Sequence, residues 1–296
     1  MLAFEDKGTS NQFTVEIDNL QALCGQLLPI IALGLAHGMT ATAIRDDYVE
    51  HGGLIFPAAS RVGRIYRLLR RGLRVGYDRD ALETQLLHMF GESTFGNARM
   101  RLVIPSFEGR HGEPWIYKTP HHPDYKLDRV ERMARVGLAT AAAPTYFRAL
   151  PNNGYLMLDG GLWANNPIMN GLVDALTCFA IDRRQVLILS LGCGETNFTV
   201  SDAKASAGFL RWYDVFNAAL RAQSLNALGQ AYLLVGKDQV IRLDAPESQR
   251  PIALDDYERA RIELPPMARS LVEASGQRIA GQFLSSQAER YTPCPA

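Results

Sequence analysis

One stretch constrains this chain more than any other: an apolar run that ends at an acid and then turns at two glycines. It reads Tyr155-Leu-Met-Leu-Asp159-Gly160-Gly161, and Leu-Trp-Ala-Asn-Asn-Pro167 follows. An apolar run bounded in this way is typical of a buried strand. A charge at its end is costly to bury unless something pairs with it, and paired glycines admit positive φ and a close approach of other groups. The pattern predicts a carboxylate held at a fixed point, either for function or to cap the turn.

Four segments carry a family resemblance. The block Asp159 to Pro167 resembles the Asp-Gly-Gly/Ala block of bacterial patatin-like phospholipases, and Ala139 to Phe147 (Ala-Thr-Ala-Ala-Ala-Pro-Thr-Tyr-Phe) resembles the segment that precedes it. Lys118-Thr-Pro-His-His-Pro123 and Leu189-Ser-Leu-Gly-Cys-Gly194 match in the same order. The resemblance runs from about Leu27 to Tyr291. It implies an α/β fold, a three-layer patatin-like sandwich with a mainly parallel central sheet, over residues 27–293, after an atypical segment 1–26.

The resemblance also implies a chemistry. Members of the family hydrolyse acyl esters of phospholipids and other lipids with a Ser–Asp dyad and without a metal or other cofactor. Asp159 occupies the position of the dyad acid, and Gly160 and Gly161 occupy its supporting turn.

The serine of that dyad is the point at which the chain departs from the family. A Gly-x-Ser-x-Gly turn should fall on Cys24 to Pro29, where Gln26 takes the place of the serine, and the Gly-rich segment that supplies oxyanion donors is not recognisable. No Gly-x-Ser-x-Gly occurs in the chain, so Ser10, the serine near the expected region, is the candidate nucleophile. Such a turn exposes the serine, and one lost oxyanion donor alone costs about 10²–10³ in rate. We therefore expect negligible turnover of short acyl esters.

Three explanations of this departure stay open. The chain is a truncated or mis-started version of an active enzyme, with the first strand and the elbow missing or altered; or it is an inactive relative that binds lipid or a regulatory partner; or Ser10 reaches Asp159 over an atypical connection.

An arginine series lies between residues 61 and 74. Arg64, Arg67, Arg70 and Arg71 alternate with apolar residues, and at helical spacing this gives a basic face opposite an apolar one. The basic face either contacts an anionic lipid surface or a phosphorylated ligand, or is solvated while the apolar side packs. The segments Lys118 to Pro123 and Leu162 to Pro167 resemble those of bacterial family members that are phospholipases activated by cyclic nucleotides in phage defence. This finer resemblance implies a cyclic dinucleotide and the inner membrane as partners.

Net charge, cysteine spacing and the length of the apolar runs indicate which partners and which compartment to expect. Formal net charge is zero, so no global field favours a DNA or RNA partner. The four cysteines show no CxxC spacing and predict reduced thiols of a cytoplasmic protein. The first residues lack a secretory pattern, and the longest apolar run is too short to span a bilayer. His121-His122 predicts a loop shaped by prolines rather than a metal site, because no further ligand cluster stands at metal spacing.

Periodicity and turn residues predict the elements. Helices are expected over 27–36, 41–51 (ended by Gly52-Gly53), 80–90, 128–142, 166–176, 209–234 and 255–283. Strands are expected over 13–17, 101–107, 114–118, 185–191 and 240–243, in addition to the run that ends at Asp159.

Overall fold

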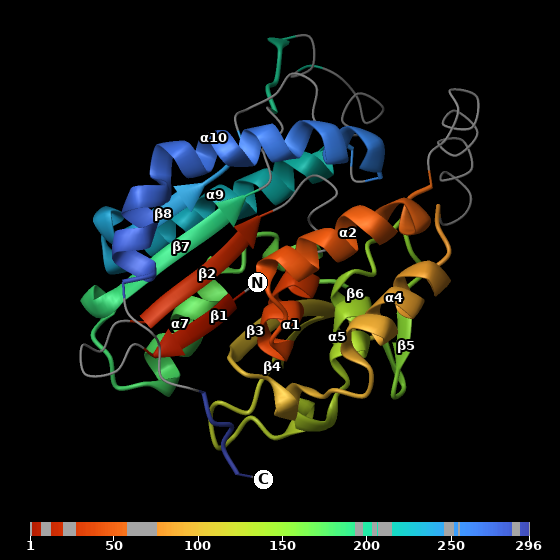
Figure 1. Cartoon of the computed structure of the whole chain (residues 1–296), viewed down its shortest axis with the longest axis horizontal. Coiled ribbons are helices and arrows are strands. Elements are labelled where there is room, and N and C mark those ends of the chain that lie inside the picture. Colours follow the sequence, from red (N-terminus) through yellow and green to blue (C-terminus); the bar gives the residue numbers. More distant parts are fainter. Residues whose placement is uncertain are drawn as a thin grey trace.

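The fold is an α/β sandwich built on one mixed sheet (Figure 1). The computed structural model describes residues 2–6, 13–19, 28–57, 76–192, 198–202, 206, 215–245, 252–253, 255–285 and 291–295. Within them, eight strands form the sheet in the order β5-β6-β3-β1-β2-β7-β8, with β4 paired to β3 off this path. The strands are β1 (Leu2–Asp6), β2 (Phe13–Asn19), β3 (Arg101–Glu108), β4 (Glu113–Lys118), β5 (Leu150–Asn152), β6 (Tyr155–Asp159), β7 (Val186–Gly192) and β8 (Val240–Leu243).

The prediction of a mainly parallel sheet is wrong, because most neighbouring pairs of the described strands are antiparallel. Among the described strands, only the neighbouring pairs β2–β7 and β7–β8 are parallel. The pairs β1–β2, β1–β3, β3–β4, β3–β6 and β5–β6 are antiparallel. The connection from β3 to β4 is short, which permits only an antiparallel hairpin, whereas a parallel pair needs a long crossover.

Helices cover both faces of the sheet, which confirms the α/β class. Alternate residues of β7 point to opposite sides, so that Val186 and Ile188 pack against α7 and α9 while Leu187 and Leu189 pack against α10. Leu102 and Ile104 of β3 belong to the large core under the first helices. The helices are α1 (Leu28–His37), α2 (Ala41–Ile55), α4 (Asp80–Phe90), α5 (Met133–Thr140), α6 (Gly161–Ala164), α7 (Ile168–Cys178), α9 (Val215–Val235) and α10 (Tyr257–Phe283).

Capping residues, proline and glycine in the sequence correctly predict where α1 and α2 begin and where α1 and α4 end. Pro29 stands in the first turn of α1, and Gly38, with φ of 100°, follows its last residue. Thr40 caps α2, because its hydroxyl oxygen accepts from the amide of Ala43 at 3.1 Å. Gly91 ends α4 as predicted.

Helix α2, however, does not end at Gly52-Gly53 but continues through both glycines to Ile55. The reason lies in a distant part of the sequence, where Tyr257 opens α10 and its hydroxyl donates to the carbonyl of Val49, 208 residues away. A Cβ on Gly52 would stand 2.6 Å from Cε2 of that ring. The glycines therefore make room for an aromatic ring between α2 and α10 and do not stop the helix.

The single helix predicted over 128–142 is divided. A 3-10 turn (Leu127–Val130) is followed by extended backbone and then by α5. At the break, Arg132 forms an isolated β-bridge with Thr94, and the amide of Met133 donates to the carbonyl of Ser93 at 2.8 Å. A tertiary backbone pairing thus overrides the helical propensity of this segment.

Candidate active site

Asp159 is the last residue of β6, as the sequence predicts, and its main chain is fixed from two sides. In the sheet it stands opposite Ser106 of β3. Its amide donates to the carbonyl of Ala142, just after α5, at 3.1 Å. The acid is therefore held where the sheet, α5 and the following turn meet.

Position 160, after Asp159, needs glycine because there is no room for a Cβ atom, and not because its backbone conformation excludes other residues. Gly160 has φ of −65° and ψ of −22°, and neither Gly160 nor Gly161 is among the residues with positive φ, so the turn does not use the positive φ that glycine admits. A Cβ on Gly160 would lie 2.2 Å from the carbonyl oxygen of Pro105, whereas real Cβ atoms do not come that close to backbone. The close approach that paired glycines permit is thus present, and it presses the turn onto β3.

The Asp159 carboxylate is half-buried and carries a perturbed pKa. Its Oδ1 accepts from the amide of Gly161 at 2.7 Å, which closes the turn. Burial raises the pKa of Asp159 to about 7, and the Gly161 hydrogen bond opposes this shift only in part. Among the described residues no other donor bonds the carboxylate. The acid thus caps its own turn with one oxygen and leaves the other without a donor among the described residues. The pKa of the carboxyl group as a whole lies near neutrality, which is the range a general base needs.

The loop beside Asp159 is strained. Thr145 has φ of 73°, although a β-branched residue rarely adopts this conformation. It is exposed, and its carbonyl accepts from the amide of Gly76 at 2.9 Å. Strain of this kind is retained mainly where the surrounding structure or function demands it. This loop belongs to the Ala139–Phe147 segment that the family resemblance includes.

The remaining predicted site residues cannot be placed beside Asp159. Ser10, which lies between β1 and β2, is outside the described residues, as is Gln26 at the expected position of the elbow serine. Arg64, Arg67, Arg70 and Arg71 also lie outside them. Their roles stay predictions.

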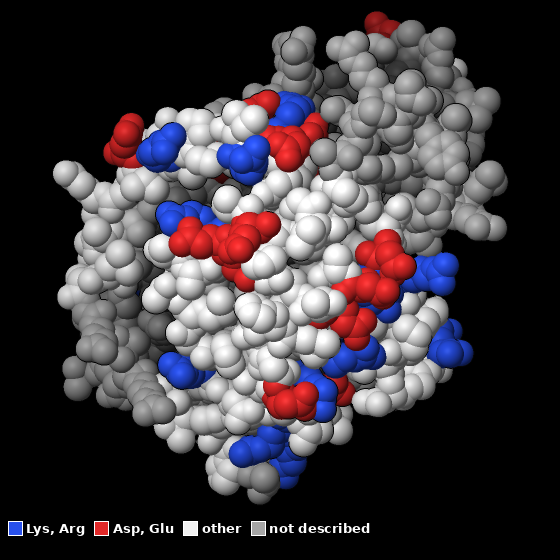
Figure 2. Space-filling model, turned by 45° about the vertical axis from the view of Figure 1, so that its right-hand side comes forward, with Lys and Arg blue, Asp and Glu red and all other residues white. Residues whose placement is uncertain are grey.

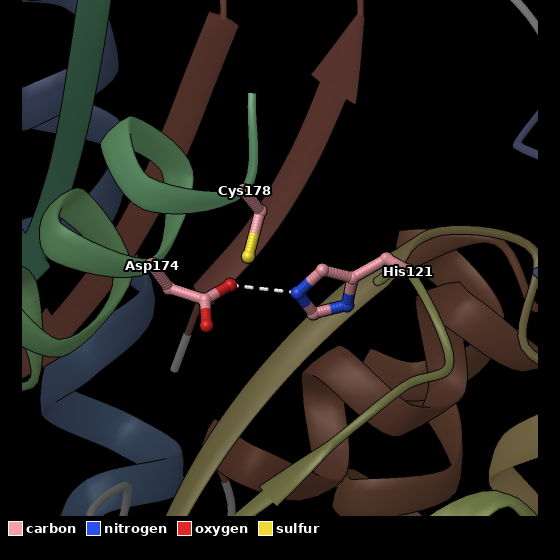
Figure 3. A group of neighbouring side chains, drawn as sticks. All are labelled: His121, Asp174 and Cys178. Carbon is pink, nitrogen blue, oxygen red and sulfur yellow. Dashed lines mark hydrogen bonds and ion pairs between the residues drawn. The ribbon is translucent and has the colours of Figure 1, made fainter. Parts of the chain in front are cut away.

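A second polar group lies between the end of β4 and α7 (Figure 3). His121 Nε2 is 2.6 Å from Oδ2 of Asp174, and the ligand atoms of His121, Asp174 and Cys178 lie within 4.8 Å of one another. The other oxygen of Asp174 accepts from Lys118 Nζ at 2.6 Å and from the Tyr125 hydroxyl at 2.8 Å. The side chain of His121 is fully buried, and these contacts hold the pKa of Asp174 below its usual value despite burial, with the His121 hydrogen bond the largest opposing cause.

Sequence reasoning missed this group because its members are far apart in the chain. No further cluster of metal ligands stands near His121-His122 in the sequence, yet the fold brings Asp174 and Cys178 to His121. The two α7 residues are four apart and share one face of a helix, a spacing that was visible in the sequence.

Surface charge on the described residues is mixed. Figure 2 shows Lys, Arg, Asp and Glu in small groups around a broad uncharged area of one face. The described part of this face therefore offers no field of one sign to a polyanion. None of the described helices combines the length and the apolarity that crossing a bilayer requires.

The chain is similar in sequence to known proteins of one family. Residues 30–172 match the family described as patatin-like phospholipase. The chain is 34% identical over 196 residues to a cGAMP-activated phospholipase of Vibrio cholerae, a match that covers 61% of this chain and 55% of the relative. It is 32% identical over 216 residues to a cGAMP-activated phospholipase of Pseudomonas aeruginosa, covering 70% of this chain and 64% of the relative. The solved structure of VipD from Legionella pneumophila aligns with 92% of this chain and 70% of that chain at 14% identity and a TM-score of 0.36.

The chain thus matches between about half and two thirds of the length of these curated relatives. The matched residues include Asp159, Gly160, Gly161 and the strained loop.

Proposed function

Because the chain belongs to the patatin-like phospholipase family, we propose that it is a lipid acyl hydrolase whose general base is Asp159. The observation that carries this proposal is the carboxylate at the tip of β6, which has a pKa raised to about 7 and one oxygen committed to Gly161. An acid that is half ionised at neutral pH both accepts a proton readily and returns it readily. A merely capping aspartate would gain nothing from such a pKa, since capping favours the ionised form.

The proposed reaction begins with the hydroxyl of Ser10. Asp159 takes its proton while the oxygen attacks the ester carbonyl, and the protonated acid then gives the proton to the departing alcohol. Water hydrolyses the acyl-serine in the second half, with Asp159 again as base. The fixed backbone of Gly160 on Pro105 keeps the carboxylate in place through both halves.

The names of the bacterial relatives support a finer proposal, in which a cyclic dinucleotide activates this chain and a phospholipid surface supplies its substrate. Arg64, Arg67, Arg70 and Arg71 are the proposed contacts for the phosphates of either partner. Contact with the inner membrane would then be peripheral.

The test is release of fatty acid from phospholipid vesicles by the full chain, with and without cGAMP. We expect Asp159→Asn and Ser10→Ala each to lower turnover on the order of 10³-fold or more. Asp46→Asn and Ser270→Ala, which change exposed residues of α2 and α10, should leave it unchanged. Turnover that survives Asp159→Asn would refute the role of this acid. Turnover that survives Ser10→Ala but is lost in Asp159→Asn would show that another residue is the nucleophile.

A second function is favoured by one specific observation, the lack of any Gly-x-Ser-x-Gly in the chain. Under this alternative the chain is a non-catalytic relative that binds lipid or a regulatory partner. It would then sediment with vesicles without releasing fatty acid, and Asp159→Asn would not alter binding. A Gly-x-Ser-x-Gly encoded just upstream of the start codon in the same reading frame would favour the enzyme.

A further inference from the structure

We propose that His121, Asp174 and Cys178 form a binding site for Zn²⁺, separate from Asp159. The three side chains come from two segments, the loop after β4 and one face of α7, and Figure 3 shows them pointing toward one another. They supply one imidazole nitrogen, one carboxylate oxygen and one sulfur. This is a donor set that zinc accepts, with one position left open.

The distances suit a tetrahedral ion after small side-chain shifts. Zinc bonds of about 2.0–2.3 Å place neighbouring ligand atoms roughly 3.3–3.8 Å apart. The three donor atoms here lie within 4.8 Å of one another, and His121 Nε2 stands 2.6 Å from Oδ2 of Asp174. The imidazole and the carboxylate therefore need to separate by about 1 Å while the thiol closes in, which rotations about side-chain bonds supply.

The surroundings of His121 match those of a metal-bound histidine. Its second nitrogen, Nδ1, is 2.9 Å from the hydroxyl oxygen of Thr119, which is itself fixed by the amide of Leu102 at 2.8 Å. Metal-bound histidines nearly always use the second ring nitrogen in this way, because the contact sets the tautomer and the ring orientation. Nε2 is thus presented toward Asp174 and Cys178 by groups that take no part in ligation.

Lys118 is the competitor of the ion. Its ammonium is 2.6 Å from Oδ1 of Asp174, so in the absence of metal Lys118 balances the charge of this carboxylate. Zinc binding with loss of the Cys178 proton adds one net positive charge. The Lys118 side chain keeps 23% exposure and can move its charge toward water, which the buried His121 cannot. When the ion binds Asp174, the Lys118 ammonium should therefore turn toward water, and removal of the lysine charge should strengthen metal binding.

The donor set also selects the class of metal. A thiolate and an imidazole disfavour Mg²⁺ and Ca²⁺, which prefer oxygen, and favour Zn²⁺ or its spectroscopic substitute Co²⁺. Cys178 is half-buried and forms no disulfide, and its thiol donates to the Tyr125 hydroxyl at 3.4 Å. Ligation of the thiolate by an ion would replace this hydrogen bond.

The experiment is a titration of the tag-free full chain, first treated with a chelator, with Co²⁺ followed by absorbance and with Zn²⁺ followed by competition with a chromophoric chelator. We expect one equivalent of either ion and a thiolate-to-cobalt charge-transfer band. Cys178→Ser should abolish that band and weaken Zn²⁺ binding at least about 100-fold, because even loss of an outer-shell partner costs about 10–100-fold. Cys294→Ser, the matched change of the other described free cysteine, should leave both unchanged.

Lys118→Met supplies a readout that a purely structural ion-pair network would not produce. It should tighten Zn²⁺ binding by roughly tenfold, since a nearby positive charge is removed. The melting temperature of this variant should fall without metal and recover when Zn²⁺ is added. Absence of saturable binding, a band that survives Cys178→Ser, or unchanged Zn²⁺ affinity in Lys118→Met would each overturn the proposal, whatever the outcome of the hydrolase assay.

Discussion

The contact between Gly160 and Pro105 yields the sharpest prediction about the candidate active site. Alanine is allowed at the φ of −65° and ψ of −22° of Gly160, so Gly160→Ala adds no conformational strain and tests space alone. Its methyl group would stand 2.2 Å from the carbonyl oxygen and 2.4 Å from the carbonyl carbon of Pro105. Both atoms are backbone of β3, and the same carbonyl already accepts from the Thr140 hydroxyl at 2.8 Å. Relief therefore requires the turn and the strand to separate.

The magnitude follows from this geometry. Overpacking a tight site costs about 1–3 kcal/mol, and a contact with immovable backbone belongs at the upper end. For a chain of this size 1 kcal/mol corresponds to roughly 2–4 °C, so we expect Gly160→Ala to lower the melting temperature by about 6–12 °C. Asp159 would move with its turn, and any hydrolase activity should fall as well.

The assay is thermal unfolding followed by calorimetry and circular dichroism, and Gly229→Ala is the matched control. A Cβ on Gly229, inside α9, meets no atom within 4 Å. Alanine is the better helix former by about 1 kcal/mol, so the control should melt a few degrees higher than the parent chain. A Gly160→Ala variant that melts within about 1 °C of the parent would refute the steric argument.

Three further changes test other parts of the structure. Because the pKa of Asp159 is raised to about 7 in the folded state, that state holds the proton more tightly than the unfolded state between about pH 4 and 7, and the stability of the parent chain falls as pH rises through this range. In urea titrations, Asp159→Asn should therefore gain stability relative to the parent chain over the same range and reach a plateau above it. Asp174→Ala should lose about 3–5 kcal/mol, because it leaves a buried ion pair without its anion, whereas Asp46→Ala, in an exposed pair, should stay within about 0.5 kcal/mol. Gly52→Ala should lose about 1–3 kcal/mol in denaturant unfolding, because its methyl group would overlap the Tyr257 ring, and an unchanged midpoint would contradict the explanation given for α2.

Local signals account for the parts of the fold that the sequence predicts correctly. The cap at Thr40 and the continuous apolar run of β7 are each written within a few residues, and the elements lie where expected. The errors come from partners that are distant in sequence. Gly52 resembles a helix stop until Tyr257 packs on it, and the helix expected over 128–142 breaks because Thr94 pairs with Arg132.

The same distinction applies to the sites. Asp159 is predictable because the strand, the acid and the glycines are adjacent in the sequence, and the family resemblance implies its role. The contact of Gly160 with Pro105 and the raised pKa depend on tertiary packing, which no local pattern encodes. His121 and Asp174 are separated by 53 residues, so only the folded chain shows that they meet.

The hydrogen bond from the Trp163 indole nitrogen to the carbonyl of Ser106, at 2.7 Å, ties the helical turn after Asp159 to the strand opposite the acid. The chain has three tryptophans, so a proton NMR spectrum contains a small number of indole signals in an otherwise sparse region. The Trp163 resonance is therefore a ready probe of this corner of the molecule. Its chemical shift and its exchange with heavy water would register a loosening of the acid's surroundings without any substrate, label or enzymatic turnover.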